Sequence, residues 1–235
     1  MPSAENARSF SKGRWLPFIE DCAPLRSQCP ISVTTGRVDT DRITNMRQEF
    51  LNCTLTFAGA GSENNVKSAP VAYLVLDEID EIDPDIRLAA LERIKGRPEY
   101  KIIQTSTPKD EIGGIWEEYS FGDQRHYYMP CPHCHEMIDF QWRQKDKDGA
   151  NRYGIAFDES AKMEEGGWDF DLVARSAHYR CQKCDGKILD AHKPNMIKHG
   201  EWQADNPNAP SNHRSYQLNS MYAPAITFAD LMINW

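Results

Sequence analysis

The stretch Tyr73-Leu74-Val75-Leu76-Asp77-Glu78 places four apolar residues directly before two adjacent acids. The continuous apolar run from Val71 to Leu76 predicts a strand that is buried on both faces of a parallel sheet. Two carboxylates at the end of such a strand are typical of sites that hold magnesium and activate water for nucleotide hydrolysis. The alternative is a solvated acidic loop that caps the following helix.

A helix and a second strand follow these acids. Residues 85–95 carry apolar side chains at helical spacing, and Lys101–Thr105 reads as a strand that ends in Ser106-Thr107-Pro108. Strand, helix and strand at this length predict a βαβ unit. Because site residues collect at the carboxyl ends of parallel strands, we expect Ser106 and Thr107 to lie near the two acids. Alternatively, their hydroxyls bond the turn before Pro108.

The sequence contains no GxxxxGK[ST] phosphate-binding loop. Lys12-Gly13 has the wrong order, and Gly186-Lys187 is followed by Ile188 where a magnesium-binding hydroxyl is needed. The chain is therefore predicted to hold part of a motor domain, which binds ATP weakly and hydrolyses little unless another chain supplies the loop.

Four of the seven cysteines form two CxxC pairs, Cys131 with Cys134 and Cys181 with Cys184. In a reducing compartment this spacing favours metal over disulfides, and four thiolates suit one tetrahedral Zn²⁺. A site closed by four cysteines predicts a structural role. Redox chemistry at one pair is the alternative, and His133 stays a spare ligand candidate, as does His135.

Length and composition limit the class of protein. The chain has 235 residues, 40% hydrophobic content and a formal net charge of −8, which is typical of a globular protein with one or two domains. No apolar run is long enough to span a bilayer and no signal core opens the chain, so we expect a cytoplasmic protein. The negative charge argues against a generally basic nucleic-acid surface, although Arg87, Arg93, Lys95 and Arg97 could contact phosphates.

Shorter elements are predicted upstream. Ala7–Leu16 is consistent with a short helix that Pro17 ends, or with a surface segment packed on a sheet. Strand candidates lie at Ile31–Thr34 and Thr54–Ala58, and the latter leads into the glycine-rich turn Gly59-Ala60-Gly61-Ser62.

Three motifs together resemble the large terminase subunit of tailed phages in the lambda-like family. They are the run from Ala69 to Asp80, the Thr105-Ser106-Thr107-Pro108 segment, and Asp123-Gln124-Arg125 leading to the first cysteine pair. The resemblance extends more weakly over most of the chain. It implies a packaging ATPase in which Asp77 and Glu78 are the Walker B acids. Asp77 is expected to hold Mg²⁺ with ATP and Glu78 to polarise the attacking water, while Ser106 and Thr107 match the segment that couples hydrolysis to movement.

The family cuts concatemeric phage DNA and drives it into a procapsid through a portal. The resemblance therefore implies double-stranded phage DNA, the small terminase subunit and the portal protein as partners, a homo-oligomer in the full protein, and the host cytoplasm as the location. A nuclease domain is expected outside this chain, which would then be a central fragment.

We thus expect an α/β chain with three parts. Residues 1–126 form a partial P-loop ATPase-type parallel sheet, residues 127–200 a zinc-ribbon-like module with an acidic insertion from 143 to about 171, and residues 201–235 a connection toward the nuclease. Two alternatives stay open: a DExD helicase fragment, which shares Asp77-Glu78-Ile79-Asp80, and a non-catalytic zinc-ribbon interaction module.

Overall fold

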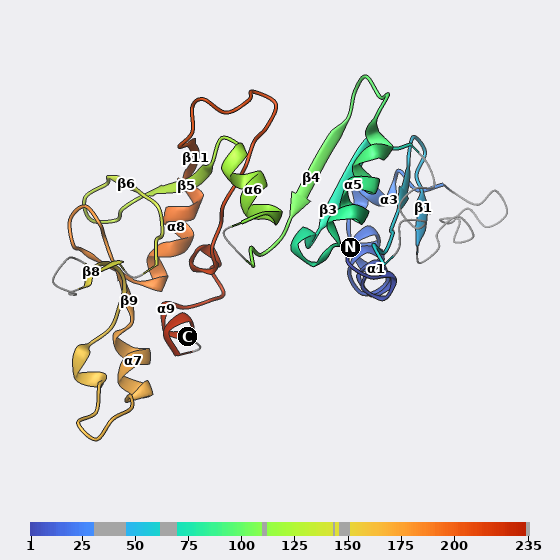
Figure 1. Cartoon of the computed structure of the whole chain (residues 1–235). Helices are drawn as coiled ribbons and strands as arrows, with labels where there is room; N and C mark the ends of the chain where they lie inside the picture. The colour runs from blue at the N-terminus through green and yellow to red at the C-terminus, as the bar shows by residue number, and fades with distance from the viewer. Residues whose placement is uncertain (31–45, 62–69, 110–111, 143, 146–150, 234–235) are drawn as a thin grey trace. The chain divides into compact units, whose positions relative to one another are not determined.

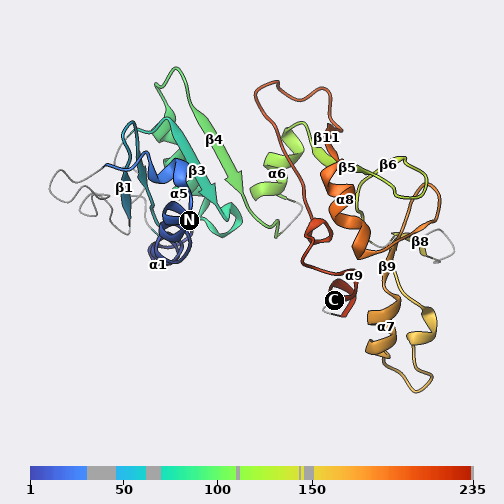
Figure 2. The same cartoon turned by 180° about the vertical axis from the view of Figure 1, so that it is seen from behind.

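The computed structural model describes residues 1–30, 46–61, 70–109, 112–142, 144–145 and 151–233. These residues form two compact units, Met1–Glu117 and Glu118–Trp235, each with its own core. Figures 1 and 2 show the chain from opposite sides. The sequence-based boundaries at residues 126 and 200 stay predictions, and the strand expected at Ile31–Thr34 lies outside the described residues. None of the described helices is long and apolar enough to cross a membrane.

The first unit opens with a helix that continues past Pro17, so the predicted stop was wrong. α1 (Ala4–Phe10), the π-helical η1 (Ser11–Trp15) and α2 (Leu16–Asp21) follow one another without a break. The π-helical turn shifts the hydrogen-bond register immediately before the proline, which then occupies the first turn of α2, where its missing N–H matters least. α3 (Ala23–Arg26) follows.

A short hairpin packs against this helix. β1 (Arg47–Glu49) and β2 (Thr54–Thr56) pair antiparallel, and β2 confirms the strand expected in this region. The Trp15 indole donates a hydrogen bond of 2.7 Å to the side chain of Gln48, which ties helix and hairpin together.

The predicted βαβ unit is confirmed. β3 (Tyr73–Asp77) and β4 (Lys101–Thr105) pair in parallel, and α5 (Pro84–Leu91) connects them. Asp83 caps α5 by accepting a hydrogen bond from the Asp85 amide, and Pro84 suits the first helical turn. The 3₁₀ turns in the connection are η3 (Ile79–Glu81) and η4 (Glu92–Ile94).

The sheet is covered on one face, so the prediction of a strand buried on both faces was wrong. Leu74 and Leu76 point into a core made with α5, whereas Tyr73 is 76% exposed and Val75 58% exposed. Within the described residues this sheet has the two strands β3 and β4, and the exposure of Tyr73, Val75 and Ile103 shows that its second face is uncovered there. The fold is mixed α/β, and its assignment to the P-loop class stays a prediction.

The second unit is built from small antiparallel sheets and short helices. α6 (Gly114–Phe121) leads into it. The three-stranded sheet has the order β11-β5-β6 and the four-stranded sheet the order β10-β9-β8-β7. The bounds are β5 (Arg125–Pro130), β6 (Met137–Ile138), β7 (Gln144–Lys145), β8 (Asn151–Ala156), η5 (Glu159–Ala161), α7 (Phe170–Ser176), β9 (His178–Arg180), β10 (Lys187–Ile188), η6 (Asp190–His192), α8 (Lys193–Lys198), β11 (Glu201–Ala204), η7 (Ser220–Tyr222) and α9 (Phe228–Ile233).

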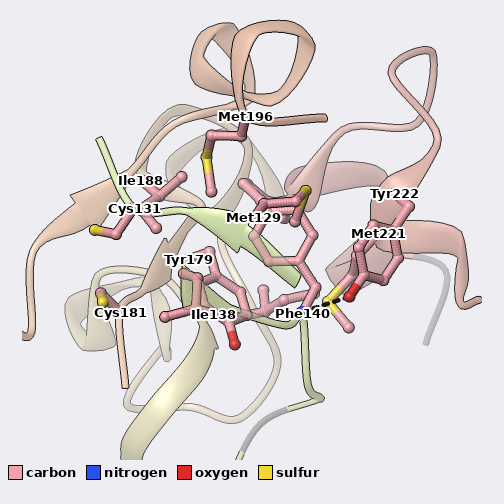
Figure 3. Close-up of a cluster of buried hydrophobic side chains, with 12 residues drawn as sticks. Met129, Cys131, Ile138, Phe140, Tyr179, Cys181, Ile188, Met196, Met221 and Tyr222 are labelled. Carbon is pink, nitrogen blue, oxygen red and sulfur yellow. Dashed lines mark hydrogen bonds between the residues drawn. The ribbon is translucent and has the colours of Figure 1, made fainter. Parts of the chain in front are cut away.

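A cluster of buried hydrophobic side chains forms the core of this unit (Figure 3), and it includes an aromatic cluster of Phe140, Tyr179, Tyr222 and Phe228. The Phe140 ring lies 4.7 Å from the Tyr179 ring, 5.3 Å from Tyr222 and 5.7 Å from Phe228, measured between centroids. Tyr222 and Phe228 come from the segment expected to be a connection. That segment therefore contributes side chains to the same core as the cysteine pairs.

Candidate functional site

The two strand ends bring three of the four predicted catalytic residues together. Asp77 and Thr105 are direct partners in the β3–β4 register. The Thr105 hydroxyl donates a hydrogen bond of 2.7 Å to Asp77 Oδ1. This bond fixes the Asp77 carboxylate at the carboxyl edge of the parallel sheet, where such folds place their reacting groups. The sequence motif predicted roles for Ser106 and Thr107 but not for Thr105. The role of Thr105 follows from the strand register, which sets it opposite Asp77.

Glu78 occupies a strained backbone position. Its φ of 57° and ψ of 54° lie in the left-handed region, which non-glycine residues rarely adopt. The Ser106 hydroxyl donates to Glu78 Oε2 at 3.4 Å and accepts from the Asp80 amide at 3.3 Å. Residues held in such conformations cluster at functional sites. The turn thus presents an exposed glutamate beside a half-buried aspartate.

Thr107 differs from Ser106 in its contacts. Its carbonyl oxygen lies 3.3 Å from the Ser106 hydroxyl oxygen and competes with Glu78 Oε2, at 3.4 Å, for the single hydroxyl proton. Among the described residues, no hydrogen bond joins the Thr107 hydroxyl to Asp77 or Glu78. The structure therefore brings Asp77, Glu78 and Ser106 into one constellation and leaves the Thr107 side chain outside it.

Asp80 links this turn to the segment that follows β4. Its carboxylate accepts hydrogen bonds from the amides of Lys109 at 3.0 Å and Ile115 at 2.7 Å. Gly114 has a φ of +54°, and a Cβ there would lie 2.2 Å from Asp80 Oδ1, so the close approach requires glycine. The sequence analysis named Asp80 only within the stretch Asp77-Glu78-Ile79-Asp80, and no local signal revealed its role, because the amides that its carboxylate binds lie 29 and 35 residues further along the chain.

The surroundings of the turn carry positive charge. The N-terminal ammonium interacts with the Asp77 charge, although burial, the larger effect, lowers the pKa of this ammonium. An open depression of about 200 Å³ beside the turn is lined by Asp80, Arg87 and Lys109, among others, and Lys109 also pairs with Glu81 at 2.7 Å. Its lining does not include Asp77 or Glu78.

The four paired cysteines converge in the second unit. The Sγ atoms of Cys131, Cys134, Cys181 and Cys184 all lie within 4.8 Å of one another. Cys131 Sγ is 3.9 Å from Cys184 Sγ, and Cys134 Sγ is 4.0 Å from Cys181 Sγ. A tetrahedral ion with Zn–S bonds of about 2.3 Å separates its ligands by about 3.8 Å. A disulfide instead needs an S–S distance of about 2.05 Å.

Both cysteine pairs sit on the same kind of turn. In each turn an amide four residues after the first cysteine donates to the carbonyl of that cysteine, from His135 to Cys131 and from Asp185 to Cys181, both at 3.0 Å. His135 and Asp185 have φ values of 64° and 61°, which reverse the chain. A backbone amide also donates to the first sulfur of each pair at 3.4 Å, and such bonds favour thiolates.

Among the described residues, the group whose ligand atoms converge contains the four cysteines and neither His133 nor His135. His133 Nε2 lies 2.7 Å from the Lys187 carbonyl oxygen, and a hydrogen bond there turns the ring toward the backbone. Burial raises the pKa of Cys131 to about 12 in the absence of a cation. A thiol that keeps its proton is a weak metal ligand, so the raised pKa does not itself indicate a metal. The observation that fits a soft divalent metal is the spacing of the four sulfurs, which matches tetrahedral coordination.

Comparison with known proteins identifies the family. Residues 1–202 match the model of the phage terminase large subunit gpA, ATPase domain. No curated protein and no solved structure matches the chain. The matched range includes the Asp77–Glu78 turn, the Ser106 segment and both cysteine pairs. Because the match covers most of the 235 residues, this chain belongs to the gpA family of phage terminase large subunits.

Proposed function

We propose that the Asp77–Glu78 turn is the hydrolytic edge of a phage DNA-packaging ATPase. The observation that carries this proposal is the pairing of each acid with a hydroxyl from the neighbouring parallel strand or the residue after it: Asp77 with Thr105, and Glu78 with Ser106. Membership in a family of terminase ATPase domains supports it. An acidic loop that served as a helix cap would not require these cross-strand bonds.

The two acids have different roles in this proposal. Asp77 is the candidate ligand for Mg²⁺, and the bond from Thr105 holds its Oδ1 in place. Mg²⁺, when bound, neutralises charge that develops on the phosphate oxygens. Glu78 polarises the attacking water and accepts its proton, for which an exposed carboxylate on a rigid turn is suited. The strained backbone of Glu78 keeps this carboxylate at the strand end.

Ser106 is proposed to pass the state of the site to the rest of the chain, with Thr107 following it in the same segment. Its hydroxyl contacts both Glu78 and the amide of Asp80. The Asp80 carboxylate in turn accepts a hydrogen bond from the Ile115 amide in the first turn of α6. A change in the Glu78 position is therefore transmitted through three consecutive hydrogen bonds to a helix.

The chain alone is proposed to be a poor ATPase. Its sequence contains no phosphate-binding loop, and Mg²⁺ with two acids does not by itself grip the β- and γ-phosphates. Another polypeptide segment would supply that loop. In the full protein we propose ATP-driven movement and cutting of double-stranded phage DNA in the host cytoplasm, together with the small terminase subunit and the portal protein.

The cysteine cluster is proposed to hold a structural Zn²⁺. Four thiolates fill a tetrahedral shell and leave no position for water or substrate, so the metal would stabilise the fold of the second unit. Cys131 and Cys181 are buried in the same core as Phe140 and Tyr179, which places the ion beside the aromatic cluster. The second candidate function, a non-catalytic interaction module, is favoured by this closed site and by the missing phosphate loop.

ATP turnover by the purified chain tests the hydrolytic proposal. We expect a low, Mg²⁺-dependent rate that Glu78→Gln abolishes and that Glu99→Gln, an exposed acid away from the turn, leaves unchanged. Efficient turnover by the chain alone would contradict the need for a second segment. A rate unaffected by Glu78→Gln would contradict the assigned site, and no Mg²⁺-dependent binding at all would favour the interaction module.

A further inference from the structure

The four clustered cysteines can react with one another, which the structural role proposed above does not use. We call the turn that carries Cys131 and Cys134 the first knuckle, and the turn that carries Cys181 and Cys184 the second knuckle. All four sulfurs are free in the structure. A sulfur that enters a disulfide no longer offers a thiolate to a metal, so bond formation and metal binding exclude each other.

Two sulfur contacts run between the knuckles. Cys131 Sγ lies 3.9 Å from Cys184 Sγ, and Cys134 Sγ lies 4.0 Å from Cys181 Sγ. Closing either contact to the disulfide distance of about 2.05 Å requires each sulfur to move by about 1 Å, which a small side-chain rotation supplies. The two pairs share no sulfur, so both bonds can form in one molecule.

Each of these pairs joins an accessible sulfur to a buried one. Cys184 is exposed, and its neighbour Cys131 is fully buried. Cys134 is half-buried, and its neighbour Cys181 is 2% exposed. Oxidation favours the sulfur that oxidant can reach, and an adjacent thiol then completes the disulfide. Each pair therefore holds a site of attack and a resolving cysteine.

Bond formation between the knuckles leaves their backbone intact. The Cys131 amide donates to the Glu136 carbonyl at 2.9 Å, and the Cys181 amide donates to the Gly186 carbonyl at 3.0 Å. Neither bond involves a sulfur. Cys131 and Cys181 also belong to the buried cluster of the second unit (Figure 3). Covalent links between the knuckles would thus hold the β5–β6 and β9–β10 hairpins to this core, as a shared ion would.

We propose that the cysteine cluster is a peroxide-sensitive switch in which two disulfides between the knuckles replace the metal ion. The reduced state, with four thiolates on one Zn²⁺, rests on the structural zinc proposed above. The oxidised state contains Cys131 bonded to Cys184 and Cys134 bonded to Cys181. It has released the ion, and its second unit stays folded.

Hydrogen peroxide supplies the oxidising equivalents. The Cys184 thiolate attacks one peroxide oxygen, so that the O–O bond breaks, an S–O bond forms, and water leaves after uptake of one proton. The Cys131 thiolate then attacks the sulfenic sulfur, the S–S bond forms, and the hydroxide leaves as water with a second proton. One peroxide thus takes two electrons from two thiolates. The second pair consumes another peroxide in the same way, and the ion loses its ligands.

Stoichiometric peroxide treatment of the zinc-loaded chain, followed with a coloured zinc indicator, tests the proposal. We expect one ion to be released for every two peroxides consumed, and reductant with added zinc to restore the starting state. Mass spectrometry of tryptic peptides should find Cys131 joined to Cys184, and Cys134 joined to Cys181. Hydrogen exchange in β5 and β9 should stay slow. The reference is the reduced chain treated with a chelator, which loses the ion without gaining bonds and should unfold.

Two variants separate the cluster from other thiols. Cys184→His removes the exposed sulfur and keeps a zinc ligand, so zinc release by peroxide should slow about tenfold or more. The matched control, Cys53→Ser, removes an exposed thiol outside the cluster and should release zinc at the unchanged rate. Peptide mapping of the unchanged chain does not depend on how well either variant folds.

Several results would overturn the switch while leaving the zinc assignment intact. They are disulfides within one knuckle, zinc release without disulfides, a release rate that Cys184→His leaves unchanged, and an oxidised unit that unfolds like the chelated one. A reduced chain that binds no zinc would overturn the zinc assignment and the switch together.

Discussion

The hydroxyl of Tyr222 joins two segments of the second unit, and its removal should destabilise that unit. Tyr222 is 7% exposed; its hydroxyl donates to the Tyr127 carbonyl at 2.8 Å and accepts from the Phe140 amide at 2.8 Å (Figure 3). Burial raises the pKa of Tyr222, so the hydroxyl keeps its proton as a donor. Tyr222→Phe removes both bonds while the ring stays in the core.

The magnitude follows from the two groups left behind. An unsatisfied buried amide costs about 1–3 kcal/mol, and the lost bond to the carbonyl adds about 1 kcal/mol. We therefore expect Tyr222→Phe to lower the free energy of unfolding of this unit by about 2–4 kcal/mol. The ring packing against Phe140 is retained, so no cavity larger than an oxygen atom forms.

Urea unfolding of the zinc-loaded chain, followed by hydrogen exchange of β5 and β9, measures this change for the second unit alone. Two compact units need not unfold together, so a single global midpoint would not suffice. Tyr216→Phe is the control, because Tyr216 is 52% exposed and should change stability by less than about 0.5 kcal/mol. A loss for Tyr222→Phe no larger than that of the control would refute the reasoning.

Three further outcomes are expected. Lys193→Met should lower the free energy of unfolding in urea by about 1–3 kcal/mol. The Lys193 side chain is fully buried and its ammonium pairs with Asp190 at 2.7 Å, so the substitution leaves the Asp190 carboxylate without this partner; an unchanged midpoint would contradict this. Asp80→Ala should speed hydrogen exchange at Lys109 and Ile115, whose amides it binds, whereas unaltered exchange would show that other acceptors replace it. A strong chelator should unfold the second unit and spare the first, since structural zinc supplies folding energy on the order of 10 kcal/mol; protection that survives metal removal would argue against the zinc assignment.

Local patterns in the sequence predicted the parts of the fold that depend on local periodicity. The apolar runs gave β3 and β4, the helical spacing gave α5, and the cysteine spacing gave the convergence of four sulfurs. These features repeat within a few residues, so hydrophobic period and turn chemistry suffice to find them.

Features that depend on tertiary contacts escaped prediction. The bond from Thr105 to Asp77 requires the strand register, and the role of Asp80 requires the path of the chain after β4. The exposed face of β3 was missed because an apolar run does not tell how many layers cover a sheet. The Tyr222 contact joins residues far apart in sequence, and residues 201–235 were expected to form a connection, so their place in this core was not predicted.

Mg²⁺-dependent nucleotide binding at the end of the parallel strands tests the central claim most directly. Titrating the labelled chain with ATP and Mg²⁺ should shift the NMR signals of Asp77, Glu78, Thr105 and Ser106 with weak affinity, and the shifts should require Mg²⁺ and vanish in Asp77→Asn. Shifts that lie elsewhere in the chain, or that persist unchanged in Asp77→Asn, would contradict the assignment of this edge as the ATPase site.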